Sequence, residues 1–182
     1  MNLEVDELIR LAKKSNQQAQ LALYDRYSAK MLGVCRHYIR DQHFAEDVMI
    51  GAFHKALESI QAYEPYGSFE GWLRRIMVRE SISYLRVQKN KFDVVEVNEG
   101  HFYQKPNQDP SDDSEEIQMA IDALPVGCKT IFNLYVIEGY KHYEIAELLE
   151  VSVGTSKSQL AHARKLLQSQ LSHLNSKNDA SR

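Results

Sequence analysis

The fold is decided by residues 142–167, which run HYEIAELLEVSVGTSKSQLAHARKLL. Ile145, Leu148 and Leu149 recur at helical spacing and predict a short first helix. Ser152 predicts the start of a second helix, because its hydroxyl can accept a hydrogen bond from a free backbone N–H. Two helices joined by so short a turn predict a helix-turn-helix.

The second of these helices has two different faces when its residues are placed about 100° apart. Its apolar stripe consists of Leu160, Ala163, Leu167 and Leu171. Small residues and hydrogen-bond donors occupy the opposite face, as a helix seated in the DNA major groove requires. The candidate DNA-binding residues here are Ser152, Gly154, Thr155, Lys157, Ser158, Ala161, His162, Arg164 and Lys165. A capped helical hairpin with a solvated basic face is the alternative interpretation.

A second candidate for nucleic-acid binding lies upstream, on a helix expected from Phe69 to about Lys91 and capped by Ser68. Three of its arginines, Arg75, Arg79 and Arg86, project within about 40° of one another. Aromatic residues precede or begin this helix, namely Tyr63, Tyr66, Phe69 and Trp72. Aromatic rings beside a cationic helix can hold unstacked bases while the arginines bind the backbone. The alternative is that Phe69 and Trp72 belong to the core, with Tyr66 as the surface aromatic.

The charge of the chain is segregated along its length, although the net charge is only −3. Residues 69–92 carry six basic and two acidic side chains, whereas residues 93–116 carry eight acidic side chains and one lysine. The acidic stretch contains Pro106 and Pro110 and few aliphatic residues. We therefore expect an all-α protein with one helical domain over residues 1–92, a flexible linker over 93–112, a second domain over 113–172 and a disordered tail over 173–182.

Several other functions lack support in the sequence. The histidines and cysteines have no zinc-ligand spacing, so we expect no metal site, and Cys35 and Cys128 are expected in the core. A P-loop, a GxSxG motif and a glycine-rich phosphate loop are all missing, so we expect no enzyme, no cofactor and no small-molecule substrate. Without an uninterrupted apolar stretch near its start, the chain is expected to be cytoplasmic.

Three stretches together resemble the extracytoplasmic-function (group IV) sigma factors of the sigma-70 family. AEDV from Ala45 with Phe53 is similar to the family's polymerase-binding helix. FEGWLRRI from Phe69, followed by YLR at 84–86, is similar to its promoter-melting helix. LP at 124–125, IAE at 145–147 and VGTSKS at 153–158 are similar to its C-terminal domain.

This resemblance implies partners and roles. The partners would be core RNA polymerase, promoter DNA and an anti-sigma factor, often membrane-bound. Polymerase would be contacted by Glu46, Asp47 and Phe53. The minus-ten element would be bound by Tyr63, Tyr66, Gly67, Ser68, Trp72, Arg75, Arg79, Ser83 and Arg86. The helix-turn-helix would recognise the minus-thirty-five element. A two-domain regulator that binds duplex DNA without polymerase is the alternative function.

One departure from the family pattern has an energetic consequence. Glu150 stands where a glycine often ends the first helix of the helix-turn-helix. A left-handed backbone there would cost a glutamate about 1–2 kcal/mol relative to glycine.

Overall fold

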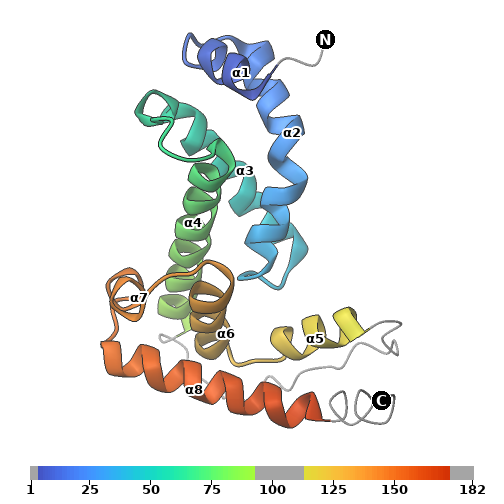
Figure 1. Cartoon of the computed structure of the whole chain (residues 1–182), viewed down its shortest axis with the longest axis vertical. Helices are drawn as coiled ribbons and strands as arrows, with labels where there is room; N and C mark the ends of the chain where they lie inside the picture. The colour runs from blue at the N-terminus through green and yellow to red at the C-terminus, as the bar shows by residue number, and fades with distance from the viewer. Residues whose placement is uncertain (1–3, 93–112, 173–182) are drawn as a thin grey trace. The chain divides into compact units, whose positions relative to one another are not determined.

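The structure is a computed structural model that describes residues 4–92 and 113–172, and within these residues it contains helices and no strands. The chain divides into two compact units, one ending at Val95 and the other beginning at Glu96 (Figure 1). The predicted all-α fold is confirmed for the described residues. The predicted linker, 93–112, and the predicted tail, 173–182, lie outside the described residues, so the domain boundaries stay predictions.

The N-terminal unit is a bundle built around three long helices. Its helices are α1 (Val5–Ala12), α2 (Gln17–Arg36), α3 (Gln42–Glu58) and α4 (Phe69–Phe92), with a 3₁₀ turn, η1 (Ile60–Ala62). The helices α2, α3 and α4 pack against one another in pairs, and α1 packs on α2 (Figure 1). Leu23, Met31, Phe53, Leu73 and Met77 are fully buried between them.

The starts of these helices follow from single capping residues. Asn16 Oδ1 accepts a hydrogen bond from the Ala19 N–H at 2.9 Å. The side chains of Asp41 and Ser68 accept equivalent bonds at the starts of α3 and α4. Each such cap satisfies a backbone donor that the helix leaves free and contributes about 1 kcal/mol. The predicted caps are confirmed.

The C-terminal unit consists of shorter helices packed on α8. It contains α5 (Asp113–Asp122), α6 (Val126–Phe132), a π-helical turn η2 (Asn133–Ile137), α7 (His142–Leu149) and α8 (Val153–Gln170). Its buried apolar residues include Leu124, Cys128, Leu134, Ile145, Leu160 and Ala163. Cys35 and Cys128 are both buried and free, as predicted.

The π-helical turn was not expected from the sequence. Glu138 N–H donates to Asn133 O at 3.0 Å, and Tyr140 N–H donates to Leu134 O at 2.9 Å. These wide hydrogen-bonded loops follow α6, and the second one includes Gly139, whose φ of 76° suits glycine. Helical periodicity alone does not distinguish such a turn from a regular helix.

The turn between α7 and α8 is a left-handed C-cap followed by an N-cap. Glu150 has φ 55° and ψ 43°, and the following Val151 N–H donates to Ala146 O at 3.0 Å. This is a Schellman motif with a glutamate at its left-handed position. Ser152 Oγ then accepts from the Thr155 N–H at 2.9 Å and starts α8. The predicted helix-turn-helix and the strained Glu150 are confirmed.

None of the helices over residues 4–92 and 113–172 is both long and apolar enough to cross a bilayer.

Candidate functional site

The α8 face, which we define as Ser158, Ala161, His162 and Lys165, is exposed along its length. On the opposite side of the helix, Leu160 and Ala163 are buried against the rest of the unit. Lys157 and Arg164 flank the face and are also exposed. The angular prediction is therefore correct, and the helix presents small and cationic side chains outwards.

Hydrogen bonds within the first turns of α8 limit the further hydrogen bonds that its hydroxyl groups can make to a partner. Ser152 Oγ and Thr155 Oγ1 are 2.9 Å apart, and Ser158 Oγ donates to Thr155 O at 3.1 Å. The Ser158 hydroxyl thus presents acceptor lone pairs outwards, since its proton is used within the helix. Gly154 is exposed beside these residues.

A polar and aromatic network fixes α8 against α7 and the π-helical turn. The His142 ring stacks on Tyr135 with centroids 4.6 Å apart, and its Nδ1 lies 2.9 Å from Ser156 Oγ. Ser156 is fully buried. The Arg164 guanidinium lies 5.8 Å from the Tyr135 ring centroid, in a cation–π contact. Arg164 therefore has a partner within the protein in addition to its predicted role at phosphates.

Two residues beneath the α8 face, Cys128 and Gln159, were not predicted from the sequence as part of this site. Cys128 Sγ of α6 lies 2.8 Å from Gln159 Oε1 and 3.8 Å from His162 Nδ1. Burial raises the pKa of the Cys128 thiol, which favours its protonated form. No sequence signal indicates these contacts, because Cys128 precedes its two partners by about thirty residues.

The aromatic residues before and at the start of α4 divide into a packed cluster and one exposed ring. In the cluster Tyr63 and Phe69 are buried and Trp72 is half-buried. The Tyr63 ring packs on Phe69 and Trp72, with centroids 5.3 and 5.4 Å away. Tyr63 is only 6% exposed, whereas Tyr66 is 87% exposed. Packing on its neighbours occupies the Tyr63 ring, and its contact with the minus-ten element stays a prediction. Tyr66 is the surface aromatic, as predicted.

The loop around Tyr66 is shaped by Gly67 and Ser68. Gly67 has φ 105°, a conformation that side-chain-bearing residues rarely adopt. Tyr63 Oη lies 3.3 Å from Gly67 O, which its hydroxyl can bond, and Ser68 caps α4. These contacts hold the loop against α4 and leave Tyr66 projecting from it.

The basic side of α4 is open to solvent. Arg75, Arg79 and Ser83 are exposed, and Arg86 is half-buried. Arg75 Nε also donates to Gly71 O at 3.3 Å, one turn earlier on the same helix. The exposed arginines lie at i and i+4 and thus on one side of α4.

The outer side of α3 carries the candidate polymerase-binding residues. Asp47 is exposed, and Glu46 is half-buried with its Oε1 accepting from Gln42 Nε2 at 2.9 Å. Phe53 is only 2% exposed and packs edge-on against Tyr24, and its contribution to polymerase binding stays a prediction. Ile50, one turn from Asp47 and 53% exposed, is an apolar surface residue at a position where the family usually has polar residues, and the sequence did not predict it as a contact.

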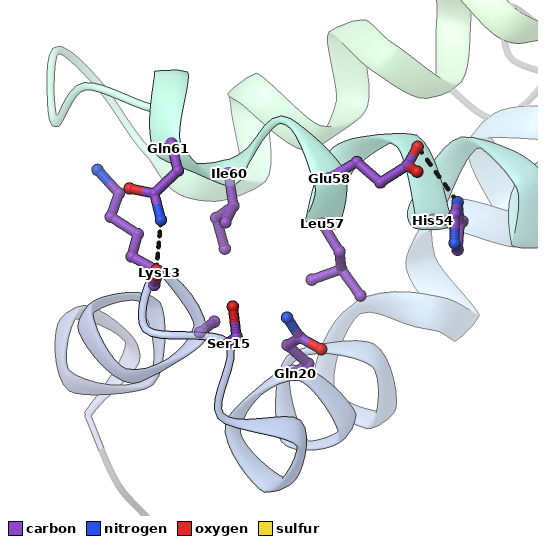
Figure 2. A pocket seen from close by; sticks show the side chains of 9 residues that line it. Lys13, Ser15, Gln20, His54, Leu57, Glu58, Ile60 and Gln61 are labelled. Atoms are coloured by element: carbon purple, nitrogen blue, oxygen red, sulfur yellow. Dashed lines mark hydrogen bonds and ion pairs between the residues drawn. The ribbon is translucent and has the colours of Figure 1, made fainter.

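The described residues also form a polar hollow where the α1–α2 turn meets the end of α3 (Figure 2). Gln61 Nε2 donates to Lys13 O, and Lys13 Nζ donates to Tyr63 O at 2.7 Å. These bonds tie the start of the Tyr66 loop to the α1–α2 turn.

Nowhere in the described part of the chain do three His, Cys, Asp or Glu side chains gather as a metal site would need.

Comparisons with known proteins agree on one family. The sigma-70 region 2 model matches residues 23–91, and the sigma-70 region 4 model matches residues 114–167. The chain is 34% identical to the RNA polymerase sigma factor SigV of Bacillus subtilis, over 74% of this chain and 80% of that protein. It is 29% identical to the ECF RNA polymerase sigma factor SigW of the same organism, over 96% of this chain and all of SigW.

A solved structure has a similar fold. The sigma factor RpoE of Bartonella quintana, solved with the anti-sigma factor NepR, matches with a TM-score of 0.54 and 21% identity, over 87% of this chain and 98% of its own. With both sigma-70 regions matched in order, the chain belongs to the sigma-70 family as an extracytoplasmic-function sigma factor, which binds core RNA polymerase and directs promoter-specific transcription initiation.

Proposed function

We propose that this sigma factor acts through three exposed surfaces, one for polymerase and two for promoter DNA. The outer side of α3 binds polymerase, the Tyr66 loop with α4 binds the minus-ten element, and the α8 face binds the minus-thirty-five element. The proposal is carried by the α8 face, where donors and small residues are exposed on a helix whose other side is buried.

At the minus-thirty-five element, α8 enters the major groove. His162 and Ser158 lie one turn apart on the α8 face and meet base edges, while Lys157 and Arg164 at its flank bind phosphates. Gly154 and Ser152 are at the N-terminal end, where free backbone N–H groups favour phosphate. Lys165 adds positive charge at the far end of the face.

At the minus-ten element, the exposed Tyr66 ring stacks on an unstacked base. Gly67 and Ser68 shape the loop that presents it, while the buried Tyr63 and the half-buried Trp72 pack on each other behind it. Arg75, Arg79 and Arg86 along α4 bind the backbone of the separated strand, with Ser83 among them.

Polymerase binding rests on α3. Asp47 supplies a charged group and Ile50 an apolar one on the same exposed side, with Glu46 at its edge. Phe53 acts indirectly, since its packing on Tyr24 fixes α3 in the bundle.

The remaining expectations concern regulation, location and chemistry. Because the similar RpoE was solved with an anti-sigma factor, we infer that an anti-sigma factor also binds this chain. A protein of this function works in the cytoplasm with polymerase. The chain itself is expected to perform no catalytic step, with the chemistry left to polymerase.

A comparison of DNA binding with and without polymerase tests the overall function. The chain alone should not retard a promoter fragment in a gel, whereas the mixture with core polymerase should. Sequence-specific binding by the chain alone would favour the duplex-binding regulator instead.

The polymerase surface is tested by reversing one charge. Asp47→Arg should abolish co-purification with core polymerase and leave the helical circular dichroism unchanged. Asp6→Arg, the same change at an exposed position of α1, is the matched control and should co-purify normally. Recovery of the Asp47 variant with polymerase at wild-type yield would contradict the assignment.

The α8 face is tested by transcription from promoters randomised across the minus-thirty-five element. His162→Ala should reduce discrimination at one or two positions by about 1–3 kcal/mol. Lys157→Ala should weaken all promoters similarly and lower the salt slope by about one unit. An equal loss on every promoter with His162→Ala, with the preferred sequence unchanged, would show that His162 does not contact bases.

A further inference from the structure

A buried thiol contacts the underside of the α8 face. Cys128 is 2% exposed and lies on α6, while its two partners lie one turn apart on α8. Its Sγ is 2.8 Å from Gln159 Oε1 and 3.8 Å from His162 Nδ1. Gln159 is half-buried and His162 is exposed, so the contact runs from the core of the unit to its surface.

The chemistry of the three groups indicates where the thiol proton of Cys128 and the N–H proton of His162 lie. A thiol has one proton, and the amide oxygen of Gln159 is its nearer acceptor. The sulfur then faces His162 Nδ1 with lone pairs rather than with a proton. A neutral imidazole carries one N–H, and a sulfur lone pair favours placing it on Nδ1. The opposite nitrogen, Nε2, is left as a hydrogen-bond acceptor.

An acceptor on the α8 face selects among bases in the major groove. Adenine N6 and cytosine N4 present amino donors there, whereas guanine and thymine present acceptors at the corresponding edge. We propose that Cys128 and Gln159 are positioning residues, an inference that rests on the proposed function in which His162 contacts a base. They hold His162 with Nε2 as an acceptor, so that it selects adenine or cytosine at its position of the minus-thirty-five element.

The tautomer can be measured without polymerase or DNA. In the ¹⁵N-labelled full chain at pH 8, two-bond ¹⁵N–¹H couplings should show the His162 proton on Nδ1. Cys128→Ala should reduce the Nδ1–H population, whereas Cys35→Ala, a buried cysteine of the other unit, should not. A wild-type His162 that is mainly Nε2–H would overturn the proposal, whatever its promoter contacts.

Promoter selection separates this inference from the proposed function. With core polymerase and the randomised minus-thirty-five library, the wild type should prefer adenine or cytosine at one position by about fivefold or more. His162→Ala should remove that preference, Cys128→Ala should reduce it at the same position, and Cys35→Ala should leave it intact. Cys128→Ser, which keeps a hydroxyl donor for Gln159, should restore it.

The possible failures differ in their meaning. If His162→Ala leaves the preference unchanged, base recognition by His162 is wrong, and the proposal that rests on it falls too. If His162→Ala removes the preference and Cys128→Ala keeps it in full, only the positioning role of Cys128 is wrong. A preference for guanine or thymine would refute the assigned tautomer. Should Cys128→Ala lose helical structure, the comparison rests on Cys128→Ser, which must retain the adenine or cytosine preference.

Discussion

Replacing Glu150 with glycine should stabilise the C-terminal unit. At φ 55° and ψ 43°, the residue occupies the left-handed position of the Schellman motif that ends α7. Relief of the left-handed backbone is worth about 1–2 kcal/mol, and the extra freedom of glycine in the unfolded chain offsets about 0.5–1 kcal/mol of it. At the middle of both ranges the net gain is about 0.75 kcal/mol, which should raise the melting temperature of this small unit by about 3–6 °C.

Thermal unfolding of the full chain measures this gain. Circular dichroism at 222 nm reports both units, while the single tryptophan, Trp72, reports the N-terminal unit and should show no shift. Glu147→Gly is the matched control, since Glu147 is exposed within α7, and it should lose about 1 kcal/mol. Glu150→Ala keeps the left-handed cost and should bring no gain. A Glu150→Gly chain no more stable than wild type would refute the reasoning.

Three further results are expected. Asp122→Asn should destabilise the C-terminal unit by about 2 kcal/mol in thermal unfolding. The buried Lys129 ammonium, which lies 2.6 Å from the Asp122 carboxylate, then loses its charged partner. Lys129→Met, which removes the ammonium itself, should destabilise the unit less. Limited proteolysis should cleave first within 93–112, whose acidic sequence predicts a linker, and early cleavage inside α3 would count against that architecture. Cys35 and Cys128 should react with a thiol reagent at pH 8 only as the chain unfolds, because burial raises the pKa of both thiols. Fast labelling of the native chain would contradict this expectation.

Local sequence determined the helices and much of the exposed α8 face. Asn16, Asp41 and Ser152 form the predicted caps, because a capping bond spans only three residues and depends on residue type. The exposure of His162 opposite Leu160 followed from the helical repeat. The π-helical turn after α6 did not follow, because the apolar spacing there fits either kind of helix.

The family resemblance also came from the sequence, because its motifs occur in a fixed order along the chain. The roles of single residues within them did not follow from this order. The resemblance predicted contacts to partners for Phe53 and Tyr63, and both side chains are buried on aromatic neighbours. Helical spacing assigns a residue to a side of its own helix, but not to the partner that covers that side.

Only the tertiary structure decided which groups meet across helices. Cys128 reaches Gln159 and His162 because α6 packs against α8, and Lys13 reaches the carbonyl of Tyr63 across fifty residues of sequence. Such contacts depend on how helices pack, which many combinations of apolar residues can satisfy, so no short pattern encodes them. The caps, by contrast, are complete within one turn of chain, and for that reason the sequence alone determined them.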